Sequence, residues 1–217
     1  MKKIVRTILA GLLCAAVFSG CGVSLDGDSS TVHVDKKGAV SSLDVEQLDQ
    51  EFYDEGELES FVKEAVEEYT QEYGRGTVKV DDITVEDQTA KLQMAYKTAE
   101  DYSRFNGIEL FAGDVVSSLA AGHTYDVEFA RVENGAVVGA ATKQDIYAQK
   151  DLKAVIIRAN TDVQVDGKIC YVSCENVKLV GPGSVSIREG YDLGTGAVTA
   201  QEDGSFETEV YTFIVYK

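Results

Sequence analysis

Three neighbouring stretches decide the fold: DEGELESFVKEAVEEYTQEY (residues 54–73), TVKVDDITV (77–85) and AKLQMAYKT (90–98). In the first stretch, apolar and aromatic side chains recur every three or four residues, which is the period of a helix. In the other two stretches they alternate, which is the period of a strand, and residues 86–88 between them have turn character. The sequence therefore predicts a long helix followed by a β-hairpin.

The predicted helix has one apolar stripe and one acidic face. The stripe includes Leu58, Phe61 and Tyr73, so we expect it to pack on a sheet, with Phe61 in the core. Asp54 and Glu57 have capping-box spacing at the start, and Gly74 can end the helix. An amphipathic helix that binds a partner is the alternative interpretation of the same stripe.

Strand-like runs separated by turn residues occupy much of the remaining chain. Residues 99–106 and a segment capped by Asp114 have the character of short helices, and residues 205–217 that of a long final strand. Asn-Gly and Asp-Gly pairs are strong hairpin signals. The expected turns are Lys36-Lys37-Gly38, Asn134-Gly135, Asp166-Gly167, Gly181-Pro182-Gly183 and Asp203-Gly204.

Strands that follow one another without regular intervening helices favour antiparallel pairing. We therefore predict an α+β fold: antiparallel β-rich sheet(s), one long amphipathic helix at about 54–73 packed on a sheet face, and one or two short helices. We expect one domain, over residues 31–217, preceded by a flexible tether at 21–30 that is small and polar.

The first twenty residues have the three parts of an export signal. Lys2, Lys3 and Arg6 are basic, the run from Ile8 to Phe18 carries no charge, and small residues follow. The apolar run is short for a hydrocarbon core of about 30 Å, so we interpret residues 1–20 as a signal peptide and not as a membrane span.

The end of this segment, Phe18-Ser19-Gly20-Cys21, resembles the lipobox of bacterial lipoproteins. The resemblance implies that Cys21 receives a diacylglycerol and becomes the mature N-terminus, with the protein on the outer face of the cytoplasmic membrane. The usual first residue is Leu, where this chain has Phe18. An ordinary secretory signal cut elsewhere is the alternative. The general plan of the rest resembles small lipoproteins of Gram-positive bacteria without an assigned activity.

The charge is strongly negative, at −17 for the whole chain. Residues 1–20 carry three basic and no acidic side chains, so the mature chain would carry −20. Nucleic-acid binding needs clustered Lys and Arg, so nucleic acid is excluded as an expected partner. We expect the lipid, and not the protein surface, to hold the protein at the membrane.

Two cysteines remain beyond the anchor, Cys170 and Cys174. On a straight strand their Cα atoms would be about 13 Å apart, too far for a disulfide unless a bulge or turn lies between them. We expect two reduced thiols on one strand face. Neither His33 nor His123 has metal-ligand spacing, so no metal or cofactor is predicted, and both histidines are expected at a surface or edge.

Sequence signatures of a nucleophile elbow, a phosphate loop or a zinc protease do not occur in the chain, and no catalytic residue is assigned. The candidate binding surface lies in EDYSRFNGIELFAGDVV, where aromatic and polar residues surround a Gly-bearing break between elements. Its members are Tyr102, Arg104, Phe105, Asn106 and Phe111.

These observations favour a non-catalytic binding module of the cell envelope, whose partner would be an envelope protein or a small ligand. A cell-envelope hydrolase using paired carboxylates is the alternative, and a solute-binding receptor comes third. Two facing carboxylates in a deep groove would favour the hydrolase. A shallow aromatic surface would favour the binding module.

Overall fold

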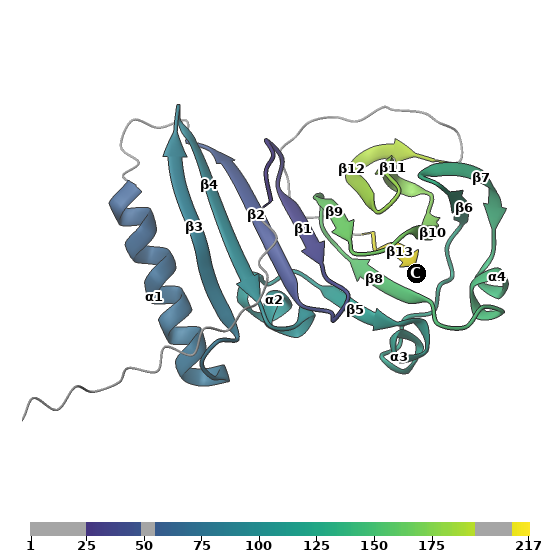
Figure 1. The fold of residues 1–217 in the computed structure, drawn as a ribbon, viewed down its shortest axis with the longest axis horizontal. Coiled ribbons are helices and arrows are strands. Elements are labelled where there is room, and N and C mark those ends of the chain that lie inside the picture. The colour runs from purple at the N-terminus through teal and green to yellow at the C-terminus, as the bar shows by residue number, and fades with distance from the viewer. Residues whose placement is uncertain (1–24, 49–54, 194–209) are drawn as a thin grey trace, which may run out of the picture.

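The computed structural model describes residues 25–48, 55–193 and 210–217 (Figure 1). These residues form two sheets and four helices, which confirms an α+β fold with antiparallel-rich sheets. The helices are α1 (Glu55–Tyr73), α2 (Ala99–Asn106), α3 (Val115–Ala120) and α4 (Lys143–Tyr147).

Sheet A has seven strands in the order β11-β12-β9-β1-β2-β4-β3. Every pair is antiparallel except β1 with β9, which are parallel. Its strands are β1 (Thr31–Val34), β2 (Val40–Gln47), β3 (Val78–Glu86), β4 (Thr89–Tyr96), β9 (Asp162–Val165), β11 (Glu175–Gly181) and β12 (Ser184–Asp192).

Sheet B has six strands in the order β5-β8-β13-β10-β6-β7, all antiparallel. The strand β13 lies in its middle, between β8 and β10. Its strands are β5 (Leu110–Asp114), β6 (Phe129–Glu133), β7 (Ala136–Ala141), β8 (Lys153–Ile157), β10 (Ile169–Ser173) and β13 (Thr212–Tyr216).

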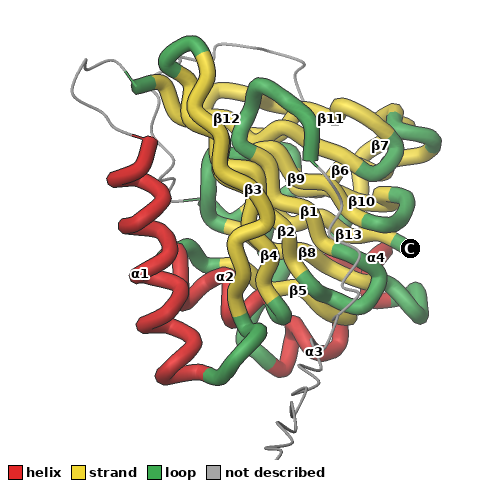
Figure 2. The backbone as a smooth tube through the Cα atoms, turned by 60° about the vertical axis from the view of Figure 1, so that its left-hand side comes forward, coloured by secondary structure: helices red, strands yellow, loops and turns green. Residues whose placement is uncertain are grey.

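The two sheets share one core. The inner face of sheet A carries Val32 and Met94, which pack in the same cluster as Val155 and Ile214 of sheet B and Val62 of α1. Figure 1 shows β9, β11 and β12 of sheet A lying beside β10 and β13 of sheet B. The opposite face of sheet B forms a second, smaller cluster with residues of α3 and α4. Figure 2 shows α1 along one flank of the strands, where it also contacts α2, because the rings of Tyr69 and Phe105 are 5.6 Å apart.

Most of the predicted turns join paired strands. The turns at 36–38, 86–88, 134–135 and 181–183 connect β1–β2, β3–β4, β6–β7 and β11–β12. Asn134 and Gly135 both have positive φ, as a type I′ turn requires. The short helix at 99–106 and the Asp114 cap are also confirmed, with Gly107 in the left-handed conformation after α2. Residues 203–204 lie outside the described chain.

The predicted hairpin at Asp166-Gly167 is wrong. The strand β9 before it belongs to sheet A and β10 after it belongs to sheet B, so the chain crosses between the sheets here. A Cβ on Gly167 would lie 2.4 Å from the Lys217 carbonyl oxygen. The glycine is therefore needed for a close approach between segments, and not for a hairpin.

The predicted packing of Phe61 is also wrong, because its side chain is 71% exposed. Val62 and Tyr69 of α1 lie in the core instead, with Leu58 and Val66 partly buried against it. The helix contacts the edge strand β3, so only a narrow stripe is covered and Phe61 falls beside it.

Part of the segment predicted as a tether packs on the domain, at Leu25 and Ser30, whereas residues 26–29 between them are exposed. Leu25 is only 5% exposed, and the Ser30 hydroxyl accepts a hydrogen bond from the Val45 amide at 3.0 Å. Residues 21–24 lie outside the described chain.

Cys170 and Cys174 are free thiols, but they do not share a strand face. Cys170 packs in the smaller cluster and Cys174 in the main core, on opposite sides of sheet B. The cause is a bulge in β10. Ile169 and Tyr171 pair with the neighbouring residues Tyr216 and Val215 of β13, so β10 has one residue more than β13 at this point. An extra residue reverses the alternation of the side chains that follow.

Candidate functional site

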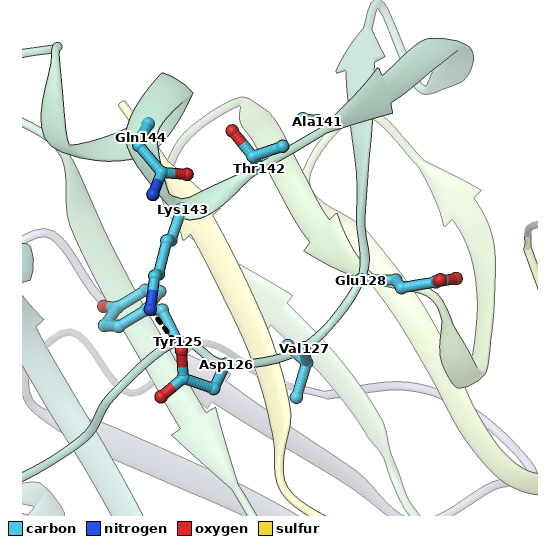
Figure 3. Close-up of a pocket in the computed structure, with 8 residues that line it drawn as sticks. All are labelled: Tyr125, Asp126, Val127, Glu128, Ala141, Thr142, Lys143 and Gln144. Carbon is cyan, nitrogen blue, oxygen red and sulfur yellow. Dashed lines mark hydrogen bonds and ion pairs between the residues drawn. The ribbon is translucent and has the colours of Figure 1, made fainter.

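An open groove of about 430 Å³ lies where β6 begins and β7 ends (Figure 3). One wall is the segment Tyr125–Glu128 leading into β6, and the other is Ala141–Gln144, where β7 passes into α4. These segments are adjacent because Phe129 pairs with Ala141 in the antiparallel ladder.

An ion pair spans the groove. The Lys143 ammonium contacts the Asp126 carboxylate, and the dashed line in Figure 3 marks this contact. The hydrogen bond from Lys143 lowers the pKa of Asp126, and the same contact raises the pKa of Lys143. Figure 3 also shows Glu128 directed away from this pair. The groove therefore holds a paired, ionised carboxylate at neutral pH and not a proton donor.

An aromatic side chain stiffens the base of the groove. Tyr125 is fully buried, and its hydroxyl lies 2.7 Å from the Ser118 Oγ of α3. Its ring is 5.8 Å from that of Tyr147, whose hydroxyl donates to the Thr124 carbonyl. Burial raises the pKa of Tyr125, so it remains protonated. The arrangement fixes the loop that forms one wall.

The strand β7 continues from this groove as an edge of sheet B. Its sequence, AVVGAA, has no charged side chain, and all of it except Ala141 is exposed. Val137 is 43% and Val138 52% exposed. Val138 lies at a bulge in the pairing with β6. We call β7 and the adjoining groove the β7 site.

The other sheet edges are protected in the described structure. Both β3 and β5 contact helices, β3 with α1 and β5 with α2 and α3. The edge strand β11 carries Glu175 and Lys178 and two register shifts. Proteins protect sheet edges with coverings, charges and bulges because unpaired backbone groups attract further strands. Of these devices, β7 has only the bulge.

The predicted binding surface does not form one surface. Tyr102 is 3% exposed and packs edge-to-face on Tyr96 in the main core. Phe105 packs against the same core, whereas Phe111 packs in the smaller cluster across sheet B. Arg104 and Asn106 are exposed. Arg104 pairs with Glu100, and Asn106 donates to the Tyr102 carbonyl.

The two histidines are more buried than predicted. His33 is buried, with Nε2 3.1 Å from the Asp166 carboxylate. His123 packs its ring 5.4 Å from that of Phe111, and burial lowers its pKa. His123 is therefore neutral at pH 7 and has a packing role. The described residues contain no group of three or more His, Cys, Asp or Glu placed to hold a metal ion.

One carboxyl group in the described chain has a pKa that is raised from its ordinary value. It is Asp44 on β2, where burial is the main cause and the nearby charge of Glu46 adds to it. The two residues occupy successive positions on the same face of β2, with Cα atoms about 7 Å apart. Sequence reasoning did not find this pair, because carboxylates are plentiful and burial decides which one titrates abnormally.

The β7 site was also missed, although RVENGAVVG contained its signal. An uncharged run after a hairpin turn predicts a strand, but whether that strand lies inside a sheet or at its edge depends on distant partners. In comparisons with known proteins, no protein-family model matches this chain, and no curated protein or solved structure does so at a significant level.

Proposed function

We propose that this protein is a lipoprotein held on the outer face of the cytoplasmic membrane through Cys21, and that it is a non-catalytic module that binds an extended segment of another envelope protein. The anchor is proposed from the signal and lipobox pattern in residues 1–21. No helix in the described part of the chain is long and apolar enough to cross a membrane.

The observation that carries the binding proposal is the exposed, uncharged edge of β7. Its outward backbone groups can pair with a further strand, and Val137 and Val138 offer apolar contact to that strand. The adjoining groove would receive the residues that continue beyond the paired segment. Binding of this kind takes its affinity from the backbone and its selectivity from side-chain pockets.

The charge of the chain restricts the partner. A segment with a net negative charge would be repelled by a mature chain of net charge −20, and a second copy of this chain would be repelled in the same way. The expected partner segment is therefore uncharged or basic, rich in residues that favour strands. Nucleic acid is disfavoured by the same charge.

The anchor is tested by replacing Cys21 with Ala. The variant should no longer incorporate radioactive fatty acid and should accumulate as the uncut precursor. Undiminished labelling would overturn the anchor.

The β7 site is tested by placing a photoreactive amino acid at Val138 in living cells. The matched control places it at Val116, an apolar residue on α3 that is 75% exposed. We expect an adduct with an envelope protein from position 138 that is missing from position 116. In the same cells, Val137→Lys should abolish this adduct without lowering the amount of folded protein. Equal adducts from both positions, or an adduct only with a second copy, would contradict the proposal.

Asp44 and Glu46 favour a second candidate, the envelope hydrolase. Glycan hydrolysis uses one carboxyl group of raised pKa as the acid and a second carboxylate, and Asp44 and Glu46 supply two carboxyl groups of these kinds on one strand face. In this case Asp44→Asn should eliminate release of sugar reducing ends from purified cell-wall glycan, while Asp28→Asn should not. If wild-type protein releases none, the hydrolase is excluded for that substrate.

A further inference from the structure

Hydrogen bonds hold residues 27–30 to the folded domain, a few residues after the proposed anchor at Cys21. The Lys91 ammonium contacts the Gly27 carbonyl oxygen at 2.8 Å and the Asp28 carboxylate at 3.1 Å. The Ser30 carbonyl accepts from the Asp162 amide at 3.0 Å and from the Thr161 hydroxyl at 2.9 Å. With Leu25 buried as well, only residues 22–24 separate Cys21 from packed chain.

These contacts place the entering chain on the outer face of sheet A. Lys91 pairs with Val45 in the ladder between β4 and β2, and side chains alternate along each strand. Its neighbour Leu92 and the next inward residue, Met94, pack into the core together with α1. Lys91 therefore projects from the opposite face, away from α1, and holds residues 27–28 there.

The outer face of sheet A and the exposed surface of α1 differ in charge. On the outer face, Lys91 is the one charged side chain of β2 and β4, and the edge strand β3 adds Lys79, Asp82 and Glu86. Among residues 56–73 of α1, on the other side of the sheet, the exposed side chains include one basic one, Lys63, and six acidic ones: Glu57, Glu59, Glu64, Glu67, Glu68 and Glu72.

We infer that the outer face of sheet A is the surface that faces the lipid bilayer. The inference rests on the proposed anchor at Cys21. Four residues of chain reach at most about 14 Å, so the acyl chains cannot lie far from Leu25. The domain is thus confined near the bilayer with the Leu25 side toward it.

Electrostatic repulsion between α1 and the membrane favours the same orientation. Anionic headgroups create a negative surface potential that decays within a Debye length of about 8–10 Å. Turning α1 toward such a surface would bring its row of glutamates into that potential. The outer face of sheet A carries charges of both signs. Lys79 and Lys91 lie there with Asp28, Asp82 and Glu86, so this orientation brings in less net negative charge than α1 does and has the lower free energy.

The test uses lipidated full-length protein, with Cys170 and Cys174 replaced by Ser, in vesicles of phosphatidylcholine and phosphatidylglycerol. A fluorescent donor is attached at Gln47→Cys on the outer face or at Glu68→Cys on α1. Both positions are exposed. With an acceptor on the lipid headgroups, energy transfer should be several-fold more efficient from position 47. Equal or reversed transfer would overturn the orientation.

Two further measurements separate the causes of failure. Wild-type protein that does not remain with floated vesicles would show that the anchor itself is wrong. Insertion of a long Gly/Ser spacer between residues 24 and 25 should remove the difference between the two donors, since the short tether confines the domain. A difference that survives the spacer would show that the surface binds lipid without the tether, which contradicts this mechanism.

Discussion

Tyr69 and Phe61 lie on the same helix, but only Tyr69 is in the core. Its ring meets that of Phe105 edge-to-face at 5.6 Å. Its hydroxyl donates to the buried Asp101 carboxylate at 3.1 Å, and that carboxylate also accepts from the Thr98 hydroxyl at 2.7 Å. The contribution of α1 to stability is therefore concentrated at Tyr69 and its neighbours.

We expect Tyr69→Ala to lower the free energy of unfolding by about 3–5 kcal/mol, since it leaves a cavity and removes a partner of a buried carboxylate. Phe61→Ala on the same helix should change it by less than about 0.5 kcal/mol, because the ring is exposed. Denaturant unfolding of a chain beginning at Leu25 measures both. A large loss for Phe61→Ala would mean that this ring is covered in solution.

The two free thiols should react slowly at neutral pH. Burial is the main cause that raises the pKa of Cys170 and of Cys174, so both remain protonated while an ordinary cysteine begins to ionise. Because the thiolate is the nucleophile, alkylation by iodoacetamide should accelerate about tenfold per pH unit through the alkaline range until the raised pKa is reached. Denatured protein is the control. Absence of free thiol in the native, unreduced protein would contradict the structure.

At the scale of elements, the β6–β7 and β11–β12 turns support each other. Gly135 has a φ of +78°, and a Cβ placed there would lie 3.0 Å from the Pro182 nitrogen and 3.1 Å from the Gly181 carbonyl carbon. The turn at the start of β7 is thus packed on the backbone of the other sheet. This contact holds the β7 edge in place at one end.

The substitutions Gly135→Ala and Gly38→Ala distinguish two reasons for glycine in a turn. One is its tolerance of positive φ, and the other is the room it leaves for a neighbouring backbone. Gly38 also has a positive φ, of +85°, but nothing lies within 4 Å of a Cβ there. Gly38→Ala should therefore cost only the backbone strain, about 1–2 kcal/mol. Gly135→Ala should cost about 1–3 kcal/mol more through overpacking, measured by denaturant unfolding. Equal losses would mean that the turns do not touch.

Sequence patterns predicted elements well where the deciding interactions are local. The turn at 134–135 was found because Asn and Gly tolerate positive φ, and α2 because the glycine that ends it, Gly107, directly follows it in the sequence. The Asp166-Gly167 hairpin was wrong because the turn signal does not specify which sheet receives the next strand. The β7 site and the raised pKa of Asp44 were missed because both depend on burial by residues far away in the chain.

At the scale of the whole molecule, β13 holds sheet B together. Phe213, Ile214 and Val215 are buried, and the strand pairs with β8 on one side and β10 on the other. Burying one large apolar side chain contributes about 1.5–3 kcal/mol, so this strand accounts for much of the ~5–15 kcal/mol that stabilises a domain.

Deletion of residues 212–217 should therefore abolish the cooperative thermal transition followed by circular dichroism. Deletion of residues 1–24 should preserve it, since the packed chain begins at Leu25. A truncated protein lacking 212–217 that still melts cooperatively would show that sheet A and its helices fold without the centre of sheet B.

The central place of β13 also has a consequence for the export that we propose for this chain. The ribosome makes β8 and β10 before β13, so the middle of sheet B stays open until residue 216 has been synthesised. A nascent chain therefore cannot complete this sheet until its last strand has been made, and an incomplete sheet favours the unfolded form that a translocation channel accepts. Under the export that we propose, folding would be completed only after residues 212–216 had followed the rest of the chain across the membrane.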